Sequence, residues 1–126
     1  MVIVVDSSVL IDHLRGDARA RTVLVDRANA GDEVWSVTVV RTEVLAGVRR
    51  GEEETTRALL ASLKWQSVTV DIADRAGELA RRFLRSYPGV DTVDYLIAAA
   101  TELLGGALLT KNVKHFPMFA DLKPAY

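Results

Sequence analysis

Acidic residues set in apolar surroundings are the part of this chain that could do chemistry. Asp6 follows the apolar run 1–5, Glu43 interrupts an apolar stretch, and Asp94 stands at the start of an alanine-rich segment. Carboxylates within a few ångströms of one another raise each other's pKa unless a cation neutralises them. A hard divalent cation does so, and it also orients a phosphate and lowers the pKa of a bound water. If these three residues converge, the chemistry that suits them is hydrolysis of a phosphodiester by water.

The composition limits which metal ion could be used. The chain has no cysteine and only two histidines, His13 and His115, so a thiolate site and a site of several imidazoles are excluded. Oxygen ligands favour Mg²⁺ or Mn²⁺. The lack of cysteine also fits a reducing compartment, and no apolar run is long enough to span a bilayer. We therefore expect a soluble, cytoplasmic protein.

The position of Asp6 depends on the element before it. Residues 1–5 form a continuous β-branched apolar run, typical of a strand buried on both faces of a parallel sheet. Asp6 then lies at the carboxyl end of that strand, where open α/β sheets bind their ligands. The alternative is structural, because Asp6 or Ser8 could simply cap the helix that opens with Val9. Residue 6 alone does not decide between the two.

Helices and strands alternate along the rest of the chain. We predict strands at 34–37, 67–70 and 107–110, with a weak last one from 122, and helices at 17–30, 38–50, 52–65, 72–87 and 91–104. This alternation predicts an α/β layer fold with a mainly parallel sheet. A chain of 126 residues, 49% hydrophobic and 26% charged, can bury a core of its own, so we expect one domain over 1–126.

Two of the acidic candidates have good structural explanations. Glu43 could be an exposed helix glutamate, and Asp91 suits the N-cap of the following helix, with Asp94 answering it in the first turn. Asp94 is harder to dismiss, since the alanine-rich helix behind it can pack closely on the sheet and hold its carboxylate near the sheet's end. Asp91 stays a reserve candidate for the site.

Four segments in order resemble a known family: VVDSSVLID at 4–12, TEVLAG at 42–47, DYLIAA at 94–99 and LLTKNVKHF at 108–116. Together they resemble the PIN-domain ribonucleases, and they are most similar to the VapC toxins of type II toxin–antitoxin systems. The similarity spans nearly the whole chain. It implies a PIN-like three-layer fold, in which a mainly parallel central sheet is flanked by helices.

The resemblance also implies an activity and partners. Asp6, Glu43 and Asp94 match the three acidic positions that hold Mg²⁺ or Mn²⁺ and activate water for RNA cleavage. Ser8 matches a small hydroxyl residue that supports the first aspartate. Proteins of this kind are commonly homodimers, and a small VapB antitoxin inhibits them by laying its C-terminal segment in the active-site groove.

The chain departs from the family in one segment. Many PIN domains carry a fourth acidic residue after the strand that we expect to end at Thr110, whereas this chain has Asn112 and His115 there. Asn112 could offer a neutral oxygen to a metal-bound water, and Asp91 could partly replace the missing charge. For His115 we predict a helix or turn residue beside Phe116.

Two other functions are compatible with the sequence. The missing fourth acid leaves open a catalytically silent PIN fold that works only as a binding module. A different Mg²⁺-dependent phosphotransfer enzyme could use Asp6 as its nucleophile, as haloacid dehalogenase-like phosphatases do, but those need a second aspartate where Ser8 stands. The sequence identifies neither the RNA nor the basic residues that contact it.

Overall fold

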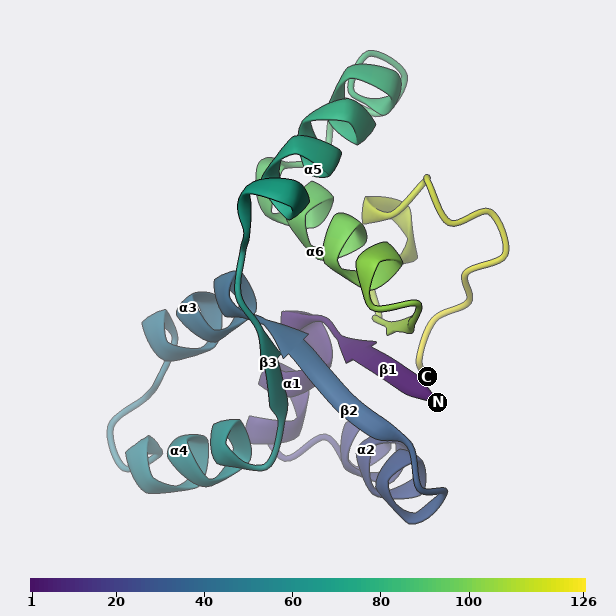
Figure 1. Ribbon diagram of the computed structural model, residues 1–126. Helices are drawn as coiled ribbons and strands as arrows, with labels where there is room; N and C mark the ends of the chain where they lie inside the picture. Colours follow the sequence, from purple (N-terminus) through teal and green to yellow (C-terminus); the bar gives the residue numbers. More distant parts are fainter.

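A four-stranded parallel sheet forms the centre of the computed structural model, which describes residues 1–126 (Figure 1). Its strands, in the spatial order β3-β2-β1-β4, are β1 (Val2–Val5), β2 (Glu33–Val37), β3 (Lys64–Gln66) and β4 (Ala107–Leu109). Strand β1 is central, and its Val4 and Val5 are completely buried, as the continuous apolar run predicted. The α/β fold with a parallel sheet is confirmed.

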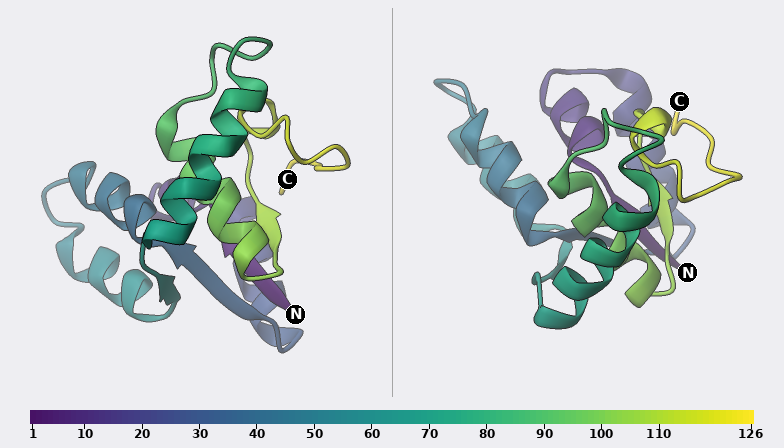
Figure 2. Two further views of the ribbon diagram at one scale, coloured as in Figure 1. Left: turned by 45° about the horizontal axis from the view of Figure 1, so that its top comes forward. Right: turned by 90° about the horizontal axis from the view of Figure 1, so that it is seen from above.

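Six helices cover the two faces of the sheet. They are α1 (Ser7–Leu14), α2 (Ala18–Asn29), α3 (Thr38–Ala46), α4 (Glu53–Ala61), α5 (Val70–Phe83) and α6 (Thr92–Leu103), and a 3₁₀ turn, η1 (Val113–His115), follows β4. The chain moves outward from β1 to β2 to β3 and then returns across the sheet to β4. Because parallel crossovers are right-handed, α1 to α4 lie on one face, and α5 and α6 lie together on the other (Figure 2).

Small residues bring α6 and β4 close to the centre of the sheet. Ala98, Ala99 and Ala100 are at most 1% exposed, so α6 packs closely, as its alanine-rich sequence predicted. At Gly106, which leads into β4, an added Cβ would lie 3.1 Å from both the Cγ1 and the carbonyl oxygen of Val2. The absence of a side chain at this position lets β4 pair directly with β1.

The strand predicted at 67–70 is wrong. The third strand is β3, three residues earlier, and Trp65 lies within it instead of ending a helix. The Thr69 hydroxyl accepts a hydrogen bond from the backbone N–H of Ile72 at 3.2 Å. Thr69 therefore caps α5, and the β-branched residues that suggested a strand begin a helix instead.

Other elements also differ from the prediction. The helix predicted at 52–65 is α4, which ends at Ala61. Helix α3 ends at Ala46 instead of residue 50, and α5 ends at Phe83 instead of residue 87. No strand forms after residue 122. Pro124 has no N–H to donate there, and the only ladder-like contact of this segment is the hydrogen bond from Ala125 N to Thr110 O at 2.8 Å. None of the helices combines the length and apolar character needed to cross a membrane.

Candidate active site

The site lies where the carboxyl ends of β1 and β4 meet. Val5 pairs with Leu109, and the backbone N–H of Asp6 donates to Leu109 O at 3.0 Å, so Asp6 and Thr110 leave the sheet side by side. From β1 the chain continues into helices on one face, whereas β4 is reached from helices on the other. This is the topological switch point of the sheet, the place where open α/β sheets bind ligands.

Asp6 is buried and held by hydrogen-bond donors from three neighbours. It is 5% exposed. Its Oδ1 accepts from Ser7 N at 2.8 Å, and its Oδ2 accepts from Ser8 Oγ at 3.1 Å and Thr110 Oγ1 at 2.7 Å. Asp6 thus caps α1 and stands at the site at the same time. These donors fix the carboxylate and compensate its removal from water.

Asp94 and Asp91 form a capping box at the start of α6. Asp94 N donates to Asp91 Oδ1 at 3.0 Å, and Asp91 N donates to Asp94 Oδ2 at 3.1 Å. Asp94 is only 7% exposed. Burial raises the pKa of its carboxyl group to about 6, the charge of Asp91 adds to the rise, and His115 works against it. Asp94 therefore carries a negative charge that its surroundings do not fully compensate.

Glu43 is exposed on α3 and points its charge at the same region. Partial desolvation raises the pKa of its carboxyl group, the nearby Ser7 hydroxyl opposes this, and the charges of Asp6 and Asp91 add to the rise. The charge of Asp91, the reserve candidate, therefore acts on both Glu43 and Asp94.

The segment after β4 brings a histidine to the acidic residues. His115 ends η1, as a turn residue was predicted to do, and its Nδ1 lies 3.3 Å from Asp94 Oδ2. Asn112 contributes its backbone N–H, which donates to Thr110 Oγ1 at 3.0 Å. Where many PIN domains would have a fourth carboxylate, the structure places a basic side chain against Asp94.

Sequence reasoning missed Thr110 and the contact of His115 with Asp94. Thr110 is completely buried and makes the shortest hydrogen bond to Asp6. Its signal was a hydroxyl residue at the carboxyl end of a predicted strand, but the sequence does not say that this strand adjoins β1. The partner of His115 likewise depends on how η1 packs against the start of α6.

The acidic side chains share one end of the sheet without closing around one point. No three or more histidine, aspartate or glutamate side chains lie close enough together to form a metal-binding group. Asp6 is held by hydroxyls, and Asp94 by Asp91 and His115. The oxygen donors themselves are those that Mg²⁺ and Mn²⁺ take in proteins, so the donor set fits such an ion. The joint coordination of one ion by Asp6, Glu43 and Asp94 stays a prediction.

Comparison with known proteins identifies the family. Residues 3–121 match the PIN domain family. The chain is 46% identical over 122 residues to ribonuclease VapC19 of Mycobacterium tuberculosis, covering 97% of this chain and 98% of that protein. It is 45% identical over 125 residues to ribonuclease VapC10 of the same species, covering 99% and 93%.

Solved structures share the fold at lower identity. A toxin–antitoxin complex from Klebsiella pneumoniae aligns with a TM-score of 0.79 at 23% identity, over 98% of both chains. VapBC-1 from nontypeable Haemophilus influenzae aligns with a TM-score of 0.77 at 19% identity, over 99% of this chain and 98% of that one. The parallel sheet, the acidic residues at its switch point and the full-length relatives agree: the chain belongs to the PIN-domain family and, within it, to the VapC ribonucleases, the toxin components of VapBC systems.

Proposed function

We propose that this chain, as a single PIN domain over 1–126, is a metal-dependent endoribonuclease toxin that hydrolyses RNA phosphodiester bonds. Asp6, Glu43 and Asp94 would hold Mg²⁺ or Mn²⁺. The observation that carries the proposal is that four carboxylates, with Asp91 as the fourth, lie at the same end of the sheet, with the imidazole of His115 beside Asp94. The ribonuclease relatives at 45–46% identity support it.

The residues of the site would have different roles, because some carboxylates are held by hydrogen bonds and one is exposed. Ser8 and Thr110 keep the Asp6 carboxylate in one orientation, and the capping box does the same for Asp94. Glu43, exposed on α3, has room to turn toward the other two. A bound ion would orient the scissile phosphate and lower the pKa of the attacking water. Asn112 has a free side chain beside the site and could contact that water.

Binding partners belong to the same proposal. We propose that a small VapB-like antitoxin inhibits the protein by laying its C-terminal segment in the active-site groove, and that the chain acts as a homodimer in the cytoplasm. The Klebsiella and Haemophilus proteins that share its fold were solved as toxin–antitoxin and VapBC assemblies. Growth arrest on expression, relieved by co-expression of the cognate antitoxin, would test the partner.

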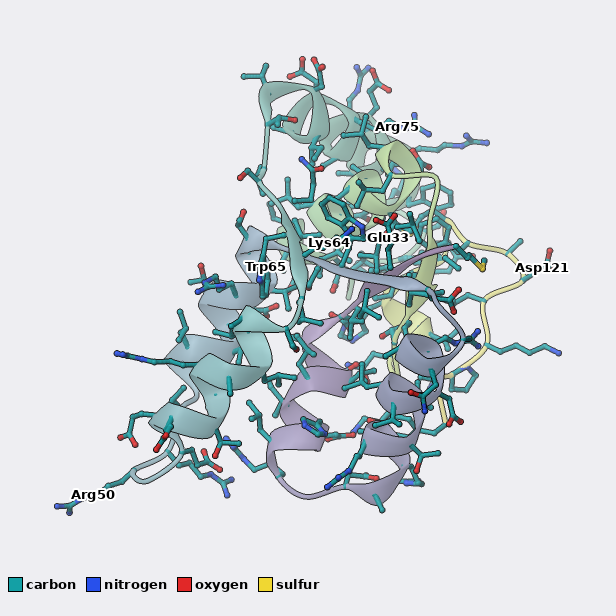
Figure 3. All side chains as sticks on the ribbon, turned by 60° about the horizontal axis from the view of Figure 1, so that its bottom comes forward. Glu33, Arg50, Lys64, Trp65, Arg75 and Asp121 are labelled. Atoms are coloured by element: carbon teal, nitrogen blue, oxygen red, sulfur yellow. The ribbon has the colours of Figure 1, made fainter.

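Cleavage of a mixed cellular RNA pool tests the activity. Purified protein is incubated with Mg²⁺, with Mn²⁺ and with a chelator, beside Asp6→Asn and Asp94→Asn. Asp121→Asn, at an exposed position on the C-terminal segment, is the matched control (Figure 3). We expect cleavage that needs metal, is lost in both site variants and persists in the control. Cleavage that survives both substitutions would mean that the site is placed wrongly.

One observation keeps the silent binding module as a second candidate. No three potential ligands converge on one point in the structure, so at least one carboxylate must move before Asp6, Glu43 and Asp94 can share an ion. A folded, antitoxin-free protein that binds RNA but cleaves nothing under any of these conditions would establish the binding module instead.

A further inference from the structure

A hollow of about 310 Å³ lies directly beside the acidic site. Its lining residues come from the segment after β4 and from the C-terminal tail: Lys111, Asn112, Val113, Lys114, His115 and Pro124. Sites for small ligands typically run from roughly 300 to 1,000 Å³. The hollow is therefore at the small end of that range, and most of its lining is basic or polar.

The wall of the hollow is fixed in place. Lys111 N donates to Ser8 Oγ at 3.2 Å, and His115 N donates to Asn112 O at 3.0 Å. Phe116, the next residue, is 1% exposed and anchors the segment in the core. Because Ser8 also donates to Asp6, one hydroxyl connects the wall of the hollow to the Asp6 carboxylate.

The two lysines of the wall differ in what they are free to do. Lys111 Nζ donates to Asp12 Oδ2 at 2.7 Å, and the Tyr126 hydroxyl donates to the same oxygen at 2.5 Å. Lys114 is exposed and forms no ion pair. Its ammonium group is the one cation of this wall that has no carboxylate to neutralise it.

His115 places the hollow next to the reaction centre. Its ring forms part of the lining, and its Nδ1 lies 3.3 Å from Asp94 Oδ2. A polyanion that reaches the four carboxylates is repelled by their negative charges. The chain as a whole carries a net charge of −1 and therefore offers no general attraction to offset this repulsion. A local cation next to the acidic residues would offset that repulsion.

We propose that this hollow binds a backbone phosphate of the RNA adjacent to the scissile one, with Lys114 as its principal cation. The inference rests on the proposed ribonuclease function and names the substrate contact that the acidic residues cannot supply. Phosphate contacts position a nucleic acid without reading its sequence. Lys114 is thus a binding residue that sets the register of the strand over Asp6 and Asp94.

The salt dependence of binding measures this contact directly. A short labelled single-stranded RNA of mixed sequence is titrated in chelator, where no cleavage is expected, at several salt concentrations. Each neutralised phosphate contributes about −0.7 to the slope of log K against log salt for a single strand. We expect Lys114→Gln to make the slope shallower by about 0.7, and Lys114→Arg to restore it.

Arg50→Gln is the control for a lost surface cation. Arg50 is exposed between α3 and α4, at the far end of the molecule from the C-terminal segment that carries Asp121 (Figure 3). Its substitution should leave the slope unchanged. An unchanged slope in Lys114→Gln, the same loss in Arg50→Gln, or no salt-dependent binding at all would each overturn the phosphate site.

Kinetics separate this inference from the function on which it rests. With Mg²⁺, Lys114→Gln should raise KM several-fold and leave kcat nearly unchanged, as expected when a contact is equally strong in the bound substrate and the transition state. A protein that cleaves normally but shows no change in slope or KM refutes the phosphate site alone. A protein that never cleaves RNA but loses slope in Lys114→Gln refutes the ribonuclease and keeps the phosphate site.

Discussion

Replacing Asp94 by asparagine should stabilise the metal-free protein at neutral pH. The carboxyl group is 7% exposed, and burial together with the charge of Asp91 raises its pKa from 3.8 to about 6. That rise is about two pKa units, worth roughly 3 kcal/mol of folding free energy. An asparagine removes this cost and still accepts the hydrogen bond from Asp91 N through its side-chain oxygen. The pKa of about 6 already includes the opposing attraction of His115, so we expect a net gain of roughly 3 kcal/mol.

The gain must depend on pH in a defined direction. Between 3.8, the pKa of an unfolded aspartate, and about 6, the folded protein binds more protons at Asp94 than the unfolded chain does. Stability of the wild type therefore falls as pH rises through this window, and the full cost is present above it. The difference between Asp94→Asn and wild type should be near zero below the window and level off above it. The titratable groups that face Asp94 are Asp91 and His115.

Urea unfolding followed by tryptophan fluorescence, with chelator present, measures the effect. With a slope of roughly 1–3 kcal/mol per molar urea, a gain of roughly 3 kcal/mol moves the midpoint by about 1–3 M. Asp121→Asn, at an exposed position, should not move it. Adding Mg²⁺ should stabilise the wild type and narrow the gap, because a ligand that binds only the folded state adds stability. A variant that is less stable than wild type at neutral pH, or a gain that is independent of pH, would refute the reasoning.

Three further substitutions test other parts of the structure. Thr110→Val removes the buried hydroxyl that donates to Asp6. It should lower the free energy of unfolding in urea by about 2 kcal/mol and reduce kcat for RNA cleavage. An unchanged kcat would show that Thr110 is not part of the site. Gly106→Ala forces a Cβ to 3.1 Å from Val2 and should lower stability by about 1–3 kcal/mol, which a clear drop in Tm would show. The Nδ1 of His13 is buried without a partner, and burial lowers the pKa of the ring below 6.5. The unfolded chain then binds the proton more readily, so stability should fall as pH drops below about 6.5, and His13→Gln should flatten this slope in pH-dependent unfolding.

The sequence predicted the elements whose pattern is set by their own residues. The apolar run 1–5 indicated a strand buried in the sheet, and the alanines of α6 indicated a closely packed helix. Strand β3 was misplaced because it is a short edge strand of three residues, Lys64–Gln66, with little apolar pattern. What decided its place was pairing with β2, in the register Ser36 to Trp65, and the capping of α5 by Thr69. Neither contact can be read from the local sequence.

The residues of the candidate site also fall into those that the local sequence predicted and those that depend on long-range packing. Asp6, Asp91 and Asp94 could be recognised because each stands next to an element with a clear pattern, at the end of a strand or the start of a helix. Thr110 and the contact of His115 with Asp94 could not, because both depend on β4 lying beside β1. Long-range strand order, which a single sequence does not encode in any short segment, is what turns a hydroxyl and an imidazole into parts of the site.

Capping and site chemistry, which the sequence presented as alternatives for Asp6 and Asp91, occur together in the structure. Asp6 accepts the N–H of Ser7 at the start of α1, and Asp91 accepts the N–H of Asp94 at the start of α6. Helix α1 begins directly after β1, and the start of α6 lies near the same end of the sheet, so both point their positive ends toward the switch point, where they favour a negative charge. The two helix starts thus offset part of the repulsion among the carboxylates. The carboxylates also stay far enough apart that the protein does not need a bound ion in order to fold. This arrangement explains how Asp6 can be buried beside other acids before any metal binds. It also explains why Asp94 bears most of the remaining free-energy cost of burying charge, because its Oδ2 is shared between Asp91 and His115.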